Sequence, residues 1–365
     1  MKVKAAVVRE KGKLAIEELE LGKPRMGEVL VKTVAGGICH TDFSTMNLEV
    51  PTTLPMVLGH EGVGIVEEVG PGVQDLQPGD HVILSYPSCG CCESCMEGKP
   101  YACDRSTELF FFGTYADRGR RLADRDGQEV GSLFGQGSFA DHCIVAERNA
   151  VKVDSEVDMK ALCSLACGVQ TGAGAVLNRM KPSAGDSIVI FGCGAVGISA
   201  IMAAKLAGCR TVIGVDVVPS RLELALACGA TDVINGRECT EIAGEVKRLT
   251  GGQGAHFALE AAGVPHLVEQ MLQSVRKEGL AVLVSFVSGP VTLDVSMLFI
   301  GPCISFAGVV EGNSNPRVFI PKLVEFYKEG RLPIDKLCEY YPFEEIDRAM
   351  ADARSGKVIK PVLIF

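Results

Sequence analysis

The sequence contains no tryptophan and only 6 tyrosines among its 365 residues, so its cores must be built from Val, Leu, Ile, Ala and Phe. Basic residues are also in the minority, with 36 Lys and Arg against 45 Asp and Glu, which gives a net charge of −9. Nucleic acids and anionic membranes both attract a cationic face. The composition therefore argues against a nucleic-acid partner and against a membrane partner.

The chain also lacks the marks of export and of membrane insertion. Residues 1–8 alternate like a strand and contain neither an apolar h-region nor a cleavage site. The uncharged run 187–204 is long enough to be tested as a transmembrane helix, but its central glycines and strand-like first half argue against one. In a secreted chain the 15 cysteines would suggest disulfides. A disulfide framework is, however, usually a feature of small domains, and this chain shows no signs of secretion. We expect a cytoplasmic protein with reduced thiols, some of them bound to metal.

The length predicts two domains. Residues 1–166 contain short β-branched runs, such as 28–34 and 64–69, separated by Gly and Pro turn signals. This pattern predicts a barrel-like domain of the antiparallel class. Residues 167–306 alternate between strand and helix patterns, which predicts βαβ units around a parallel sheet, and residues 307–365 add two helices and a last strand.

Within the second domain, one helix has clear end signals. We expect it to run from Pro219 to Cys228, with Ser220 as its cap and Gly229 marking its end.

A glycine turn dominates the second domain. Gly192-Cys193-Gly194-Ala195-Val196-Gly197 follows the apolar run 187–191 and opens a helical pattern. In such a turn the first glycine makes the bend, the second lets the backbone reach a pyrophosphate, and the third lets helix and strand pack closely. The helix N-terminus then holds the anion. A glycine turn without a ligand is the alternative, but the strand–turn–helix context favours a dinucleotide site.

Asp216, at the end of the next predicted strand, bears on the type of dinucleotide. A carboxylate there accepts hydrogen bonds from the ribose 2′-OH and repels a 2′-phosphate, which favours NAD over NADP. Arg221 lies close by in the sequence and offers a cation for a phosphate, so the preference is not absolute.

Four cysteines with short gaps predict a metal site in the first domain. Four thiolates make a closed tetrahedral zinc site of the structural type. A cluster of free thiols or a nucleic-acid zinc ribbon would be the alternatives, and the acidic balance disfavours the ribbon. Cys91 is a fifth sulfur, and we choose Cys92 because it gives even gaps. The predicted ligands are Cys89, Cys92, Cys95 and Cys103.

Cys39, His60 and Cys167 suggest a second metal site. Two thiolates and one imidazole leave a fourth position open, as a catalytic zinc requires. Spacing alone makes only a moderate case, because a lone cysteine is more often a small core residue.

Together these motifs resemble the zinc-containing medium-chain dehydrogenases, over nearly the whole chain. G-H-E-x-x-G at 59–64, the four-cysteine lobe, the Cys167 junction and the glycine turn carry the resemblance, and C-H-T-D at 39–42 is similar to aryl (benzyl) alcohol dehydrogenases. The resemblance implies a GroES-like catalytic domain, a doubly wound Rossmann domain of the α/β class, two zinc ions, and a homodimer or homotetramer formed by edge pairing of Rossmann sheets. It implies an enzyme that interconverts a small alcohol and its aldehyde by hydride transfer with NAD.

The resemblance also assigns roles to individual residues. Cys39, His60 and Cys167 become the ligands of the catalytic zinc, with Glu61 behind the metal and Asp42 on the second nitrogen of His60. The remaining assignments are Thr41 on the substrate oxygen, Thr171 and Val196 against the nicotinamide, and His40 and Lys360 toward the pyrophosphate.

Two positions depart from the family pattern. Ser44 stands where the animal enzymes have a histidine that relays the proton to solvent, so the proton must leave by another route. His40 stands where many relatives have an arginine on the pyrophosphate. A neutral imidazole holds phosphate less well than a permanent cation, so we expect weaker NADH binding and faster release.

The substrate pocket is inferred from places relative to the predicted zinc and nicotinamide. Ser85, in place of a bulkier residue, is expected to widen it for an aromatic or branched primary alcohol. The run 109–112 is either a lip over this pocket or an ordinary buried strand. The predicted lining residues are Ser85, Leu133, Phe134, Phe139, Phe286 and Val309.

Three other functions remain open at this point. An NADPH-dependent reductase of aldehydes or enones would use the same fold, and Asp216 opposes it. A non-catalytic binding module would not need intact ligands at all three catalytic positions. A polyol dehydrogenase often carries a carboxylate in place of Cys167.

Overall fold

A computed structural model describes all residues, 1–365, and the chain forms two compact units. Unit 1 comprises 1–167, 314–329 and 334–365, and unit 2 comprises 168–313 and 330–333. The domain boundaries predicted at 166/167 and 306/307 stay predictions. Each unit is described by itself below.

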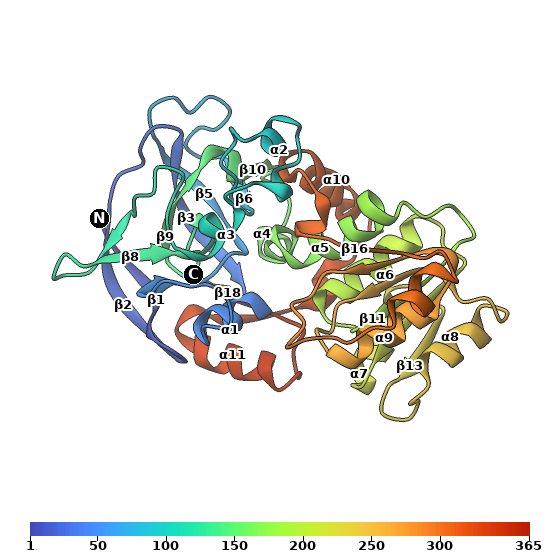
Figure 1. Ribbon diagram of the computed structural model, residues 1–365. Coiled ribbons are helices and arrows are strands. Elements are labelled where there is room, and N and C mark those ends of the chain that lie inside the picture. Colours follow the sequence, from blue (N-terminus) through green and yellow to red (C-terminus); the bar gives the residue numbers. More distant parts are fainter. The chain divides into compact units, whose positions relative to one another are not determined.

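A small closed barrel begins unit 1 (Figure 1). Its first strand shows why the sequence alternates: Val3, Ala5 and Val7 enter one apolar cluster, while Ala6 and Val8 enter another, so both faces of the strand are buried. The expected barrel-like fold is confirmed. Its strands, in hydrogen-bonded order, are β1 (Lys2–Glu10), β2 (Lys13–Leu21), β7 (Leu122–Ala123), β8 (Glu129–Ser132) and β4 (Met56–Val57).

A 7-stranded sheet completes the β structure of unit 1. Its long strand, β3, pairs with β5 along one edge, and along the other it pairs with β9 through residues 28–32 and with the C-terminal β18 through residues 35–37. This return of the chain end places Lys360 beside the residues that follow β3. The strands are β3 (Glu28–Gly37), β5 (Gly62–Val69), β6 (His81–Leu84), β9 (His142–Ala146), β10 (Ala150–Val153), β17 (Cys338–Pro342) and β18 (Lys360–Ile364).

Short helices connect these strands and carry some of the candidate site residues of unit 1. The α-helices are α1 (His40–Met46), α2 (Glu93–Met96), α3 (Ser106–Phe111), α4 (Met159–Leu162), α10 (Pro316–Lys328) and α11 (Ile346–Arg354). The 3-10 turns are η1 (Pro100–Ala102), η2 (Leu133–Gly135), η3 (Glu147–Asn149), η4 (Cys163–Ala166), η8 (Ile334–Leu337) and η9 (Phe343–Glu345).

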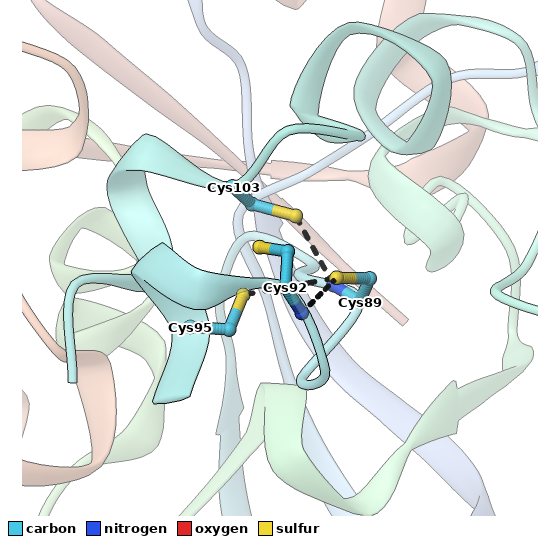
Figure 2. A group of neighbouring side chains, drawn as sticks. All are labelled: Cys89, Cys92, Cys95 and Cys103. Carbon is cyan, nitrogen blue, oxygen red and sulfur yellow. Dashed lines mark hydrogen bonds between the residues drawn. The ribbon is translucent and has the colours of Figure 1, made fainter. Parts of the chain in front are cut away.

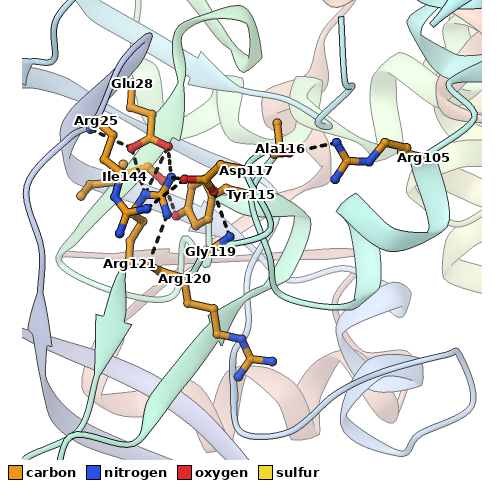
Figure 3. A network of polar contacts seen from close by, with 10 residues as sticks. All are labelled: Arg25, Glu28, Arg105, Tyr115, Ala116, Asp117, Gly119, Arg120, Arg121 and Ile144. Atoms are coloured by element: carbon orange, nitrogen blue, oxygen red, sulfur yellow. Dashed lines mark hydrogen bonds and ion pairs between the residues drawn. The ribbon is translucent and has the colours of Figure 1, made fainter. Parts of the chain in front are cut away.

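A buried polar network ties the segment before β7 to β3 (Figure 3). Arg121 donates to Glu28 at 2.5 Å and to Asp117 at 2.9 Å, and its guanidinium lies 4.4 Å from the centre of the Tyr115 ring. The Tyr115 hydroxyl donates to the carbonyl of Ile144 at 2.7 Å. Buried charges are costly unless they are paired. Every charge in the centre of this network is paired, so we assign the network a structural role.

Unit 2 is built on a 6-stranded parallel sheet. Its central strands are continuous apolar runs, as expected for strands covered on both faces: all residues of β11 are buried. The predicted Rossmann-like α/β arrangement is confirmed. In sheet order the strands are β13 (Asp232–Asn235), β12 (Thr211–Asp216), β11 (Ser187–Phe191), β14 (Ala255–Glu260), β15 (Val275–Leu283) and β16 (Ser305–Gly308).

The helices of unit 2 follow these strands in alternation. They are α5 (Gly168–Gly174) with the π-helical turn η5 (Ala175–Met180), α6 (Ala195–Leu206), α7 (Pro219–Cys228), α8 (Ile242–Leu249), α9 (Pro265–Ser274), the π-helical turn η6 (Ser296–Ile300) and the 3-10 turn η7 (Glu311–Asn313).

One of the predicted helix signals is wrong. Helix α7 has the predicted bounds and ends at Gly229, whose φ of +124° is in the region that favours glycine. Its N-cap, however, is Val218, and Ser220 lies inside the first turn. Pro219 takes the first helical position, where its missing N–H costs nothing, and this fixes the start two residues earlier than a cap at Ser220 would.

No single helix is long and apolar enough to cross a membrane. The two helical segments Met159–Ala166 and Gly168–Met180 pass the length and composition test only as a bent pair, a test that buried core helices also pass.

Candidate functional site

Four side chains from three separate segments meet in unit 1. Cys39 is the N-cap residue of α1, His60 and Glu61 precede β5, and Cys167 follows the 3-10 turn η4. Their candidate ligand atoms all lie within 4.8 Å of one another. The structure thus brings together the three predicted catalytic ligands and the glutamate expected behind the metal.

Asp42 orients two of these residues. Its Oδ1 lies 3.1 Å from His60 Nδ1 and accepts from the N–H of Gly59, while its Oδ2 accepts from the N–H of Cys39 at 2.9 Å. Asp42 and His60 are both 0% exposed. The predicted contact between Asp42 and the second nitrogen of His60 is present, and it fixes the ring so that Nε2 is the free nitrogen.

The donor set fits a zinc ion. His60 Nε2 is buried and has no hydrogen-bond partner, which is costly unless another group binds it. Burial lowers the pKa of His60, but Asp42 and Cys39 raise it by more, so that it lies well above its ordinary value. A hydrogen bond with Cys167, aided by Lys360 and His60, lowers the pKa of Cys39 well below its ordinary value despite burial. A dication bound here would replace the protons of this group, as metal binding usually does.

Glu61 has a partner that the sequence did not reveal. Lys360, the first residue of β18, places its Nζ 2.6 Å from Glu61 Oε2 and 3.1 Å from the carbonyl of Ile38. The side chains of Lys360 and Glu61 are 2% and 0% exposed. The ammonium of Lys360 is thus paired with Glu61 inside unit 1, and its predicted role toward a pyrophosphate stays a prediction.

The second cysteine group lies in the lobe between β6 and α3 (Figure 2). The sulfurs of Cys89, Cys92, Cys95 and Cys103 lie within 4.8 Å of one another, and all four cysteines are free. The sulfurs of Cys89 and Cys95 are 3.9 Å apart, close to the separation of about 3.8 Å that two sulfurs have around a tetrahedral zinc.

The lobe already supplies hydrogen bonds to its sulfurs. The N–H of Cys92 donates to the sulfur of Cys89, and the N–H of Cys89 donates to the sulfur of Cys103, each at 3.3 Å. Burial raises the pKa of Cys89, but backbone donors from Cys91 and Cys92 outweigh it and lower the value to about 6. Cys91 is itself exposed, and Cys92 rather than Cys91 belongs to the group, as the even gaps predicted.

Aromatic residues lie beside His60. The ring of Phe134 is 4.8 Å from the imidazole and stacks on Phe110 at 4.4 Å. Phe134 adopts a φ of +52°, an uncommon conformation for a residue with a side chain, which costs roughly 1–3 kcal/mol. Phe110 belongs to the run 109–112, which forms helix α3 and the residue after it rather than the expected strand. Its first three residues are buried, and its role as a lip over the pocket stays a prediction.

The other predicted pocket residues fall into two groups. In unit 1, Ser85 is 1% exposed and donates to the carbonyl of Ala166, next to Cys167, and Leu133 and Phe139 are 0% exposed. In unit 2, Val309 is 5% exposed and Phe286 is 65% exposed.

In unit 2 the glycine turn has the predicted geometry. Gly192 has a φ of +94°, and a Cβ on Gly197 would overlap its carbonyl, so helix α6 packs directly against the turn. A Cβ on Gly194 would meet nothing within 4 Å, which leaves open space for a ligand next to the N-terminus of α6. Helix α5 crosses this end of α6, because a Cβ on Gly172 would overlap the carbonyl of Val196. Gly172, the residue after Thr171, thus packs against Val196, and the nicotinamide contacts predicted for Thr171 and Val196 stay predictions.

Asp216 holds the same turn from the end of β12. Its Oδ2 accepts from the N–H of Cys193 at 2.7 Å, and its Oδ1 accepts from the N–H groups of Val217 and Val218. Arg221 Nη1 is 4.0 Å from Asp216 Oδ2, and its buried Nε has no hydrogen-bond partner. The carboxylate thus shapes the glycine turn and keeps lone pairs for a ligand.

Helix α1 carries the residues expected to handle substrate and proton. Thr41 is partly exposed and His40 is exposed, directly after Cys39. Ser44, one turn further, is 4% exposed and donates to Glu49 Oε2 at 3.1 Å. Glu49 is exposed, so this pair links the helix interior to solvent.

Two buried residues near the candidate sites are not predicted from the sequence. Gln136, 1% exposed, contacts the backbone around His60. Glu260 ends β14, is 0% exposed, and accepts from the N–H groups of Ala262 and Gly263 at 2.9 Å, beside Gly192. Neither residue belongs to a short motif, so only their long-range contacts reveal them.

Known proteins share both the sequence and the fold. Residues 25–155 match the alcohol dehydrogenase GroES-like domain, and residues 195–329 match the zinc-binding dehydrogenase family. Geraniol dehydrogenase of Castellaniella defragrans is 36% identical over 364 residues, which cover 99% of this chain and 97% of that protein. The NDMA-dependent alcohol dehydrogenase of Amycolatopsis methanolica is 36% identical over 374 residues, which cover 100% of this chain and 99% of that protein.

Two solved structures superpose closely on the chain. The alcohol dehydrogenase zinc-binding domain protein of Burkholderia ambifaria is 43% identical with a TM-score of 0.96, and benzyl alcohol dehydrogenase of Acinetobacter calcoaceticus is 40% identical with a TM-score of 0.95. Each match covers 100% of this chain and 99% of the other. The chain therefore belongs to the zinc-binding medium-chain alcohol dehydrogenases, and it is a zinc-dependent alcohol dehydrogenase.

Proposed function

We propose that the enzyme interconverts a primary aromatic or allylic alcohol and its aldehyde, with NAD as the hydride carrier. The observation that carries this proposal is the buried His60 Nε2, which has no protein partner and faces two thiols within 4.8 Å. Cys39, His60 and Cys167 would hold a zinc ion with one position left for an alcohol oxygen, and the four cysteines of the lobe would hold a structural zinc.

Bound zinc supplies Lewis acidity that lowers the pKa of an alcohol hydroxyl, and bound nicotinamide accepts the hydride. The protein's own groups do the rest. Asp42 keeps the imidazole of His60 in the tautomer that presents Nε2. Thr41, which follows Cys39 on α1, receives the hydroxyl proton. Lys360 binds the carboxylate of Glu61 through their 2.6 Å ion pair.

The proton then needs a route to solvent, because no histidine stands at position 44. We assign this role to Ser44 and Glu49. Ser44 is buried on the same helix as Thr41 and already donates to the exposed carboxylate of Glu49. Replacing Glu49 by Gln is expected to lower kcat, and an added imidazole buffer is expected to restore it. A variant with unchanged kcat at every pH would argue against this route.

NAD is favoured over NADP by Asp216. A carboxylate at the end of β12 accepts hydrogen bonds from a ribose diol and repels a 2′-phosphate. Asp216 is held in place by three backbone N–H groups, so it cannot swing away from such a phosphate without leaving them unpaired. Gly192, Gly194 and Gly197 with the N-terminus of α6, which includes Ala195, would receive the pyrophosphate. The role predicted for His40 toward a pyrophosphate stays a prediction.

The substrate class rests on the surroundings of His60 and on the relatives. Phe134 and Phe110 place stacked aromatic faces next to the imidazole, and Ser85 contributes a small side chain near Cys167. Flat, apolar alcohols pack well against such rings. Relatives named for benzyl alcohol and for geraniol support the same class.

A panel of alcohols tests the proposal. Benzyl alcohol, geraniol and ethanol are each assayed with NAD+ and with NADP+ by following nicotinamide absorbance, and the corresponding aldehydes are assayed with the reduced cofactors. The expected result is that kcat/KM is highest for benzyl alcohol or geraniol with NAD+. A preference for ethanol would refute the substrate class. A preference for NADP+ would refute the cofactor assignment and point to Arg221 as a phosphate ligand.

We also propose a homodimer or homotetramer formed at the edge of the sheet in unit 2. Strand β16 pairs only with β15, so its other edge is free, and Met297 and Ile300 nearby are each 74% exposed. Free strand edges and grouped apolar side chains are features of self-association surfaces. Met297→Asp is expected to shift the molecular mass toward one chain in sedimentation velocity, whereas Met26→Asp, at an equally exposed methionine of unit 1, is expected to leave it unchanged.

A further inference from the structure

Residues 133–139 lie along the segment that contains His60. The N–H of Phe139 donates to the carbonyl of Leu58 at 2.9 Å, and the N–H of Ser138 donates to the carbonyl of Gly59 at 3.0 Å. These two backbone hydrogen bonds attach the loop to the chain just before the candidate zinc ligand.

The backbone pairing stops at His60, and a side chain continues it. The N–H of Gly137 turns back to Leu133, so it makes no contact with the next carbonyl. Instead, Gln136 Nε2 donates to the carbonyl of His60 at 3.0 Å, and Gln136 Oε1 accepts from the N–H of Gly62 at 3.3 Å. One amide thus spans the peptide groups on both sides of Glu61.

The loop is shaped to present this amide. Phe134, Gly135 and Gly137 all have positive φ, between 52° and 57°. This unusual backbone turns the Gln136 side chain into the protein, where it is 1% exposed and also lies 3.4 Å from the carbonyls of Leu84 and Ser85. Because the left-handed conformation of Phe134 is costly, the packing of Phe134 and Gln136 must hold the loop in place.

We propose that Gln136 is a positioning residue for the catalytic metal: its amide fixes the backbone of His60 and Glu61 and thereby sets the direction of the His60 ligand atom. The inference rests on the proposed zinc site. The contact suits an amide, since its NH2 group donates to one peptide group while its oxygen, in the same planar group, accepts from the other. Glutamate would place an acceptor against the His60 carbonyl, and methionine would offer neither bond.

The experiment compares zinc release from the whole enzyme into an excess of a chelating dye. Cys167→Ser, which removes one predicted ligand of the catalytic site, identifies the release phase of that site. The four-cysteine group of the same chain provides an internal reference. Gln136→Met is the test variant, and Gln273→Met, at a partly exposed glutamine of α9, is the matched control.

The expected result is that Gln136→Met releases the catalytic zinc about 10- to 100-fold faster, the usual effect of losing a residue that supports a metal ligand. The other zinc and the Gln273→Met protein should keep wild-type rates. Cobalt(II) placed in the catalytic site should show a changed ligand-field absorption in Gln136→Met, because the direction of the imidazole changes. If that variant does not fold, Gln136→Glu, which keeps the acceptor for Gly62, takes its place.

Three outcomes would overturn the inference. Unchanged release of the catalytic zinc in a folded Gln136 variant would show that the amide does not position His60. Faster release of both zinc ions would show a general loss of stability instead. A wild-type enzyme that holds zinc only in the four-cysteine group would refute the proposed function itself, and this inference with it.

Discussion

The ion pair between Lys360 and Glu61 offers the sharpest test of how the site of unit 1 is held together. The pair is 2.6 Å long, and its side chains are 2% and 0% exposed. Replacing Lys360 by Met keeps much of the volume of the side chain but removes its charge. Glu61 would then be a buried carboxylate that has lost this ammonium, among the sulfurs of Cys39 and Cys167.

The size of the effect follows from this burial. Removing one member of a buried ion pair costs about 3–5 kcal/mol, because the remaining buried charge loses the partner that offset its desolvation. For a cooperative unit of this size, that loss lowers the melting temperature by roughly 6 to 20 °C. Burial raises the pKa of Glu61, and Lys360 opposes this rise in the wild type. In Lys360→Met the carboxyl group therefore takes up a proton more readily, so the cost should be smaller at about pH 5 than at about pH 8.

The assay is urea denaturation of the chelator-treated protein, followed by circular dichroism because the chain has no tryptophan. Glu61→Gln and the double variant Glu61→Gln, Lys360→Met complete a thermodynamic cycle. The double variant buries no charge at this position, so it should be more stable than Lys360→Met. If Lys360→Met unfolds within about 1 kcal/mol of the wild type, or if the double variant is the less stable of the two, the reasoning is wrong.

Four further outcomes are expected. Gly62→Ala should lower stability by about 1–3 kcal/mol in thermal denaturation, because its Cβ would lie 2.6 Å from the Cβ of Ser138; an unchanged melting temperature would show that the backbone yields. Gly244→Ala in α8 should raise stability by up to about 1 kcal/mol, since its Cβ would meet nothing closer than 3.9 Å; a loss would contradict this. The pKa of His142 is raised chiefly by a hydrogen bond to its neighbouring aspartate. Its contribution, at most about 1 kcal/mol, should be present below about pH 6 and lost as pH rises through the raised value, so that His142→Gln and the wild type converge at alkaline pH. His40→Arg should slow NADH release about tenfold in stopped-flow fluorescence, and an unchanged rate would exclude a phosphate contact there.

Much of the fold could be predicted because its signals are local. The alternation in β1, the fully apolar β11 and the strand–turn–helix glycine pattern each lie within a few residues, and the period of the apolar residues distinguishes strand from helix. The four-cysteine lobe is local as well, so its spacing was enough to select Cys92. Local signals fail where two of them compete, as at Pro219 and Ser220.

The contacts that complete the site join distant parts of the chain. Lys360 and Glu61 are 299 residues apart, and Gln136 and His60 are 76 residues apart. Neither pairing leaves a periodic pattern in the sequence, because each depends on where β18 and the loop 133–139 are placed by the rest of unit 1. The sequence therefore predicts neither the pairing of Lys360 with Glu61 nor the contact of Gln136 with His60. The run 109–112 is expected as a lip or a buried strand, and its helix is not predicted, because a short apolar segment fits a buried helix as well as a buried strand.

The central claim is that two groups of residues in unit 1 each hold a zinc ion and that the group around His60 supports alcohol oxidation. Zinc content per chain, measured by elemental analysis while a chelator strips the metal and alcohol oxidation is followed in parallel, tests it most directly. We predict two zinc ions per chain, with oxidation falling in proportion to the loss of the zinc that Cys167→Ser lacks. One zinc ion per chain in the active wild-type enzyme, or oxidation that persists after that zinc has been removed, would contradict the claim.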